Sequence, residues 1–429
     1  MRFTAAGDAI IQRRIQEGFA GLKEIAPFVK RGDGRFFNLE TTLNREGECF
    51  ASQFSGGTYI RTNPEMLHDV KKFGFNMTSF NNNHAMDFSY EGLLKTLEHL
   101  EAGDIVHAGV GKNLDEAAAP RYLETPNGRV ALIAVNTSFD PSMMAGTQGR
   151  RVPGRPGING LCIDEKIIAS KEELKVIKDL AKKIQLNAQR EITRREGYQA
   201  ELPEDQAEFG PFILEAGEKA EYRRTVNKAD MARVEKAIYE AQFQADYIII
   251  SIHSHQLSGD KKENPSSFLC DFAHACIDAG ANAVVGHGPH LLRPIEIYKD
   301  CPIFYSLGDF ILQLYSVEFA PEDFYNKYGL NTDSTIHQLL KQRSRDFTVG
   351  LMTDRRMFQS VIPYWETKEK KITKLELLPI ECAMKGNKSE AGLPRIATDL
   401  EFIDRLAEMS AYSGIRMQIE KDSIVACKW

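Results

Sequence analysis

The sequence has 429 residues, of which 42% are hydrophobic and 27% are charged, a composition typical of a folded globular protein with one large domain or two. A formal net charge of −6 gives no electrostatic basis for binding nucleic acid or an anionic membrane surface. No apolar run approaches about eighteen residues, so we expect no membrane span. The first residues have no apolar signal segment, and the seven cysteines are scattered without a Cys-x-x-Cys pair. These features favour reduced thiols in a cytoplasmic protein.

The first part of the chain alternates short apolar runs with amphipathic segments. Arg2–Ala6 is expected to form a strand that ends before Asp8, and the spacing of apolar residues over positions 10–19 predicts a helix. Further strands are expected at residues 35–42 and 74–80. This alternation of strand and helix predicts a layered α/β core.

Each of these strands is followed by side chains that can bind a metal or transfer a proton. Asp8 follows the first strand, Glu40 lies at the end of the second, and the third continues into Asn83 and His84. Asp87 is spaced to orient the imidazole three residues before it. Each residue also has a structural interpretation, as a turn residue, a surface glutamate or part of a helix-capping turn.

Residues 141–235 differ in character from the segments on either side. They are highly charged, and their apolar residues recur at roughly helical spacing. We expect an inserted helical region that covers the site, forms an oligomer interface or only elaborates the surface.

The second half of the chain contains two apolar runs that end in histidines. Residues 245–252 form the most β-like run, and His253 and His255 at its end project to the same side of an extended chain. A second buried strand at residues 281–285 leads into the sequence Gly-His-Gly-Pro-His at residues 286–290. Two imidazoles on one stiff turn suit metal binding, although a turn with two hydrogen-bonded histidines has the same sequence.

Considered together, these polar side chains come from five separate strand ends, which predicts a metal site at a sheet edge. Carboxylate, amide and imidazole ligands suit one or two ions of Mn, Fe, Zn or Ca rather than a thiolate metal site. Such a metal would polarise an oxyanion and activate a water molecule as nucleophile.

Several motifs in the chain resemble those of a known family. They are Gly7-Asp8, Asn38-Leu39-Glu40, Asn82-Asn83-His84-Ala85-Met86-Asp87, the apolar strand into His253, the histidine-containing turn at 286–290, and residues 303–310. In this order and spacing, residues 1–140 and 240–315 resemble the CapA family, which is named for capsule and poly-γ-glutamate synthesis proteins. That family is related to calcineurin-like metallophosphoesterases.

The resemblance implies a four-layer αββα sandwich of the metallophosphoesterase type. We therefore expect a domain over residues 1–315, with the helical insertion at about 141–235. A C-terminal α+β extension over residues 316–429 is expected to pack on the same domain.

The resemblance also implies roles for individual residues, which we extend to neighbouring positions. The expected catalytic residues are His84, Asp87 and His255, and the expected metal ligands are Asp8, Glu40, Asn83, His253, His287 and His290. The expected substrate-binding residues are Arg61, Arg293 and Asp309.

The sequence departs from the phosphoesterase pattern at three positions. Ile10 stands where the first motif usually has a histidine, which would leave one metal position weak or empty. Glu40 stands where an aspartate is usual, and Asp309 stands in a Gly-Asp-Phe sequence where the CapA family has Gly-Asn-Phe.

Three functions remain open at this stage. The first is a metal-dependent hydrolase that acts on a phosphoester, or on a γ-glutamyl or other peptide amide, in poly-γ-glutamate or capsule metabolism. The second is a metal-dependent peptide epimerase on the same scaffold, and the third is a non-catalytic accessory protein that binds γ-linked glutamate polymer. The expected partners are a small-molecule or peptide substrate and a second copy of the chain.

Overall fold

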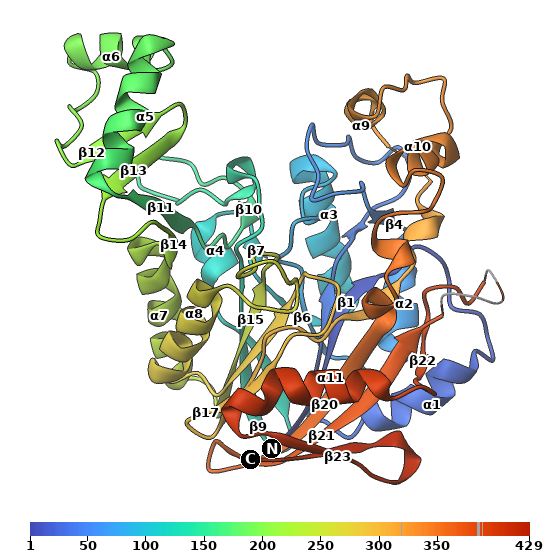
Figure 1. Ribbon diagram of the computed structural model, residues 1–429. Coiled ribbons are helices and arrows are strands. Elements are labelled where there is room, and N and C mark those ends of the chain that lie inside the picture. The colour runs from blue at the N-terminus through green and yellow to red at the C-terminus, as the bar shows by residue number, and fades with distance from the viewer. Residues whose placement is uncertain (319, 384–386, 388) are drawn as a thin grey trace. The chain divides into compact units, whose positions relative to one another are not determined.

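The strand β1 (Arg2–Ile10) is buried along almost its whole length, because its apolar residues are covered on both faces of a ten-stranded sheet (Figure 1). It runs parallel to β2 (Gly34–Leu39) on one side. On the other side it pairs with β20 (Gln359–Lys368) near its start and with β19 (Asp309–Leu312) at its end. The remaining strands are β5 (Met77–Ser79) and β6 (Val106–Ala108) beyond β2, and β21 (Lys371–Cys382), β22 (Pro394–Ile396), β23 (Arg416–Ile419) and β24 (Val425–Lys428) beyond β20.

A second sheet of six strands is built around the two apolar runs that end in histidines. Its order is β17 (Ile295–Tyr298), β18 (Cys301–Phe304), β16 (Ala283–His287), β15 (Tyr247–His253), β9 (Gly128–Asn136) and β8 (Arg121–Thr125). The four inner strands are parallel, and β8 and β17 pair antiparallel at the two edges.

The two sheets pack against each other through one apolar core. Phe3 and Phe36 of the first sheet lie in the same cluster as Tyr247 and Phe304 of the second. Phe37, next along β2, points to the opposite face, where α1 (Ala20–Val29), α2 (Met66–Lys71) and α3 (Ser89–Ala102) form another cluster. Further helices are α4 (Leu114–Ala118), α7 (Lys228–Gln242), α8 (Ser267–Asp278), α9 (Glu322–Lys327), α10 (Ile336–Arg343) and α11 (Glu401–Ser410). Of these, α8 contacts β16.

The prediction of a mixed α/β fold is confirmed, and the four-layer arrangement stays a prediction. The computed structural model describes residues 1–318, 320–383, 387 and 389–429. Short two-residue strands complete the description: β3 (Thr42–Leu43), β4 (Arg61–Thr62), β7 (Val110–Gly111) and β10 (Gly157–Ile158). No helix among the described residues is both long and apolar enough to cross a lipid bilayer.

The chain divides into two compact units, one of residues 1–161 and 229–429 and the other of residues 162–228. The smaller unit has the order β12 (Gln206–Phe209), β13 (Phe212–Ala216), β11 (Ile163–Ala169) and β14 (Glu221–Val226), with α5 (Lys171–Lys183) and α6 (Ala188–Arg195). This unit lies within the expected insertion over 141–235, whose bounds stay a prediction, and it contains strands as well as the expected helices. Its strands are rich in charged residues, so they lack the apolar alternation that identifies a strand in a sequence. The expected domain bounds at residues 315 and 316 stay a prediction.

The helix expected at residues 10–19 is wrong, since β1 extends to Ile10 and a loop follows it. In this loop the backbone amide of Gln12 donates to Gln313 Oε1 at 2.8 Å, and the amide of Ile15 donates to Asp69 Oδ2 at 2.9 Å. Side chains from distant segments thus replace the hydrogen bonds that a helix would supply.

Candidate metal centre

The carboxyl ends of parallel strands from both sheets meet at one site. In the first sheet Asp8 is paired in register with Asn38, near the carboxyl end of β2, on one side and with Asp309, the first residue of β19, on the other. In the second sheet His253 is paired with His287. This convergence of polar side chains at strand ends is the usual location of a ligand site in open α/β sheets.

Close backbone approaches explain the glycines in these motifs. A Cβ atom at Gly7 would lie 1.7 Å from the carbonyl oxygen of Gly308, so no larger residue fits there. Gly288 has a φ of +117°, and its amide donates to Asp8 Oδ2 at 2.9 Å. His290 follows with a φ of 60°, an unusual left-handed conformation that orients its ring toward the same site.

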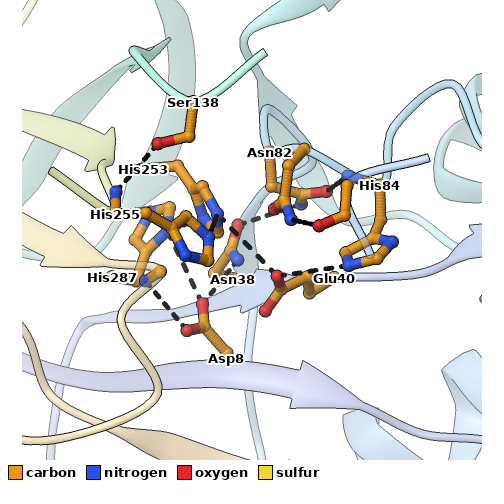
Figure 2. A network of polar contacts seen from close by, with 12 residues as sticks. Asp8, Asn38, Glu40, Asn82, His84, Ser138, His253, His255 and His287 are labelled. Atoms are coloured by element: carbon orange, nitrogen blue, oxygen red, sulfur yellow. Dashed lines mark hydrogen bonds and ion pairs between the residues drawn. The ribbon is translucent and has the colours of Figure 1, made fainter. Parts of the chain in front are cut away.

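The Asp8 carboxylate is fully buried and held by two donors. Asn38 Nδ2 donates to its Oδ1 at 2.7 Å, and the Gly288 amide donates to its Oδ2. His287 Nδ1 lies 3.6 Å from Oδ1 (Figure 2). Burial raises the pKa of Asp8 to about 7. The ionised form of the Asp8 carboxylate would therefore be stabilised by a nearby cation.

The Glu40 carboxylate is also fully buried, and neither of its oxygens has a hydrogen-bond partner among the described residues. Its Oε1 lies 3.8 Å from His253 Nε2, 3.9 Å from His84 Nε2 and 4.0 Å from His290 Nε2. These separations are too long for hydrogen bonds. Two ligands of one ion, each at about 2.0–2.2 Å from it, are separated by about 3–4 Å. Burial, together with the charge of Asp8, raises the pKa of Glu40 well above its ordinary value.

Three of the histidines form a continuous row of imidazoles. The Nδ1 atoms of His253 and His287 are 2.9 Å apart, and the Nε2 atoms of His253 and His255 are 3.0 Å apart. His287 Nε2 lies 2.7 Å from Ser251 Oγ. Burial lowers the pKa of all three rings, to about 3 for His287. The rings are therefore neutral at physiological pH, which is the form that binds metals.

His290 and Asp309 form a close ion pair beside this row. The His290 Nδ1 atom lies 2.9 Å from Asp309 Oδ1, whereas Asp309 Oδ2 has no partner among the described residues. Burial by itself would lower the pKa of His290, but the charges of Asp309, Glu40 and Asp8 raise it to about 10. Asp309, which is expected to bind substrate, lies inside the cluster of possible ligands.

The donor set fits a divalent cation. The unpartnered buried oxygens of Glu40 and Asp309 have the chemistry of missing metal contacts. Three overlapping groups offer ligand atoms within 4.8 Å of one another: Asp8, His253 and His287; Glu40, His253 and His255; and Asp8, Glu40, His290 and Asp309. Because these groups share members, they offer neighbouring positions for cations.

His84 faces this cluster from the end of the third strand. Its Nδ1 lies 2.7 Å from Asp87 Oδ2, which also accepts from the amide of Ile60 at 2.8 Å. The Nε2 atom is thereby directed toward Glu40 (Figure 2). Asn83 has a buried side-chain carbonyl oxygen without a partner among the described residues, as a further ligand would have.

Two predicted substrate-binding residues, Arg61 and Arg293, do not line the cavity beside the cluster. A cavity of about 250 Å³ is lined by Asn83, His84, His255 and His290, among others. Arg61 lines a separate cavity of about 40 Å³. Arg293 is fully buried, and its guanidinium donates to the backbone carbonyls of Lys262 at 3.0 Å, Ser254 at 3.2 Å and Gln256 at 2.9 Å. It is therefore occupied in holding the loop that follows β15.

Sequence reasoning gave no role to several residues that shape the site. Asn38 lies on the same face of its strand as Glu40, a spacing that could have identified it as a partner of Asp8. Asn82 donates to the Leu39 carbonyl at 2.7 Å and accepts from the His84 amide at 3.1 Å. Arg343 lines the cavity from α10, and no sequence motif marks it.

The fold and this geometry define a mixed α/β protein with a candidate divalent-metal centre where strand ends of the two sheets meet. The chain belongs to the bacterial capsule synthesis protein family PGA_cap, whose family model matches residues 2–314. The resemblance to CapA proteins seen in the sequence is thereby confirmed.

Related sequences and one solved structure resemble this chain to different degrees. The uncharacterized protein y4sH of Sinorhizobium fredii is 30% identical over 97% of this chain and 90% of its own length. The capsule biosynthesis protein CapA of Bacillus anthracis is 22% identical over 72% of this chain and 59% of its own length. A putative 5'-nucleotidase from Staphylococcus aureus, solved with alpha-ketoglutarate, superposes with a TM-score of 0.38 at 12% identity, covering 90% of this chain and 55% of that chain. That overlap is too low to inform function.

Proposed function

We propose that this protein is a metal-dependent hydrolase that cleaves a phosphoester or a γ-glutamyl or other peptide amide. The proposal includes a four-layer sandwich of the metallophosphoesterase type and a link to poly-γ-glutamate or capsule metabolism, the latter supported by family membership. The single observation that supports it most is the buried Glu40 carboxylate, unpartnered and facing three imidazole nitrogens at 3.8–4.0 Å.

In this proposal the cation is held by the ligand set expected from the sequence, together with Asp309. A divalent ion bound there supplies Lewis-acid polarisation of a substrate oxygen and lowers the pKa of water. The ligand types admit Mn, Fe, Zn or Ca, in one or two positions. The proposed ligands are Asp8, Glu40, Asn83, His253, His287, His290 and Asp309.

His84 is the proposed proton donor. The Asp87 carboxylate holds Nδ1 and fixes the ring, so that Nε2 presents its proton to the leaving group of a substrate in the 250 Å³ cavity. His255 lines the same cavity and would orient the substrate. Burial of the cluster limits the access of bulk water.

Metal content and turnover test the proposal together. Protein purified without chelator should contain about one or two equivalents of metal by mass spectrometry, and His287→Ala should lose most of it. His274→Ala is the matched control, because that histidine pairs with Glu296 away from the cluster. Hydrolysis of p-nitrophenyl phosphate or of a γ-glutamyl anilide should stop with chelator and return with metal. A wild-type protein that stays metal-free after reconstitution would rule out the hydrolase.

A binding role is the second candidate, favoured by a relative from Mycobacterium tuberculosis named as a probable polyglutamine synthesis accessory protein, 26% identical over 64% of this chain. In this alternative the chain would bind γ-linked glutamate polymer without cleaving it. Polymer binding that is unchanged in His84→Ala, with no turnover by the wild type, would favour this role over hydrolysis.

A further inference from the structure

The cavity beside the metal centre has a wall with a single sign of fixed charge. Apart from the histidines, the charged residues that line it are Lys262 and Arg343, and no carboxylate among the described residues lines it. By contrast, the carboxylates of Asp8, Glu40 and Asp309 cluster with His290, one of the histidines that line the cavity. The part of the cavity lined by Lys262 and Arg343 therefore attracts anions, whereas the carboxylates beside His290 attract cations.

Arg343 is held in place but lacks an acidic partner. It is half-buried at the end of α10, donates to Thr58 Oγ1, and lies over the Phe324 ring with its Cζ 5.5 Å from the ring centroid. Within the described residues it forms no ion pair. A Cβ atom at Gly57 would lie 3.8 Å from Arg343 Nη2 and 3.9 Å from His84 Cε1, so these two atoms are less than about 8 Å apart.

Lys262 supplies a second positive charge on the same wall. Its side chain is exposed, while its carbonyl is fixed by the buried Arg293 at 3.0 Å. The charge of Lys262 is among the influences, after burial, that lower the pKa of His255. The loop that places His255 at the metal centre thus also places a cation at the cavity.

A second cavity of about 400 Å³ adjoins the first at Gly56, Asn83 and His255. Ser138 and Asp140 line it, and no lysine or arginine does so among the described residues. Of these two cavities, the first is lined by lysine and arginine and the second, within the described part of the chain, is not.

We infer that the cavity lined by Arg343 and Lys262 binds an oxyanionic group of the substrate, a carboxylate or a phosphate, and directs the neighbouring bond toward His84. The guanidinium of Arg343 offers paired donors that match such a group, and Lys262 adds a point charge. This inference rests on the proposed function for the identity of the reacting centre. Arg343 lies beyond the residues 2–314 that match the family model, so the C-terminal part of the chain contributes this residue to the binding site.

Calorimetric titration of the full-length, metal-containing protein tests the inference with two probes, γ-glutamylglutamate and inorganic phosphate. Arg343→Gln should weaken binding of at least one probe about tenfold or more, and Arg343→Lys should restore part of it. The affected probe distinguishes a carboxylate from a phosphate. Arg345→Gln, at an exposed arginine just past the same helix, is the matched control and should bind like wild type.

The possible outcomes separate this inference from the hydrolase proposal. Binding of both probes by Arg343→Gln within twofold of wild type, or no binding by the wild type at millimolar concentration, would overturn the anion site even if the protein hydrolyses substrates. Arg343-dependent binding of a probe, with no hydrolysis of p-nitrophenyl phosphate or of a γ-glutamyl anilide, would support the anion site and contradict the hydrolase proposal. Lys262→Gln, on a separate loop, should weaken the same probe about threefold to tenfold and guards against a folding defect in the α10 variant.

Discussion

Replacing Glu40 with glutamine should have opposite effects on stability with and without metal. Without metal, the wild type must bury a carboxyl group that has no partner and lies near Asp8 and Asp309. Glutamine is also polar, so the substitution relieves only the cost of the carboxylate charge or of the proton that neutralises it, about 1–3 kcal/mol at one to two pH units above the ordinary pKa of glutamate. With metal, the same carboxylate becomes a ligand, so its loss should weaken metal binding and the stabilisation that metal provides.

The expected shifts follow from the size of the chain. Unfolding of 429 residues has an entropy of about 0.9 kcal/mol per kelvin, so 1–3 kcal/mol corresponds to about 1–3 °C in Tm. In chelator, Glu40→Gln should melt that much above the wild type. Metal at about 100 times its Kd should raise the wild type by about 2.7 kcal/mol, or about 3 °C, and should raise the variant less.

The pH dependence of the stability of the metal-free protein provides an independent test. The folded-state pKa of Glu40 is raised, so between its unfolded value and that folded value the native chain keeps a proton that the unfolded chain has lost. The stability of the metal-free wild type should therefore fall as pH rises, by about 1.4 kcal/mol per pH unit from this group. The advantage of Glu40→Gln should grow accordingly from pH 5.5 to 7.5 in calorimetric melts. Equal losses of Tm in Glu40→Gln with and without metal would refute the reasoning, because they would show a structural glutamate.

Three further outcomes are expected. His84→Ala should lower kcat by about 10²–10⁴ while the metal content by mass spectrometry stays unchanged; loss of metal would identify that ring as a ligand instead. Gly7→Ala should destabilise the fold by about 3 kcal/mol or more in urea titrations, because the new Cβ would lie 1.7 Å from a backbone carbonyl, whereas Gly149→Ala, with no neighbour nearer than 3.7 Å, should stay within about 1 kcal/mol. Burial by itself would raise the pKa of Asp69, but hydrogen bonds from Arg14 and a neighbouring lysine lower it. Asp69→Asn should therefore be about 1–3 kcal/mol less stable at pH 7, and this gap should close as pH falls below about 4, where the wild type loses the same contribution; a gap independent of pH would contradict the assignment.

The parts of the site that the sequence predicts are those encoded by single strands. β15 and β16 are long apolar runs followed directly by histidines, so both the strands and their end positions are visible in the sequence. Asp8 and Glu40 are found in the same way, by their place at the end of a buried run. The motif resemblance then groups these residues at one site.

Contacts between distant segments are what the sequence does not reveal. The loop after β1 takes its hydrogen bonds from Gln313 and Asp69, so its apolar spacing imitates a helix that does not form. Arg343 lies 285 residues after its hydrogen-bond partner Thr58 in the sequence, yet both line the same cavity. Arg293 looks like a ligand-binding arginine, yet its donors are used by backbone carbonyls, which only a folded chain shows.

The strand order has a consequence for how this protein is made. The Met1 carbonyl accepts from the backbone amide of Thr367, 366 residues later, and β1 depends on β20 for one of its edges. During synthesis on the ribosome, β1 emerges more than 300 residues before β20, so this edge stays unpaired until β20 has been made. A chain cut at the end of the family match would lack β20 and would leave the start of β1 as a bare strand edge open to aggregation.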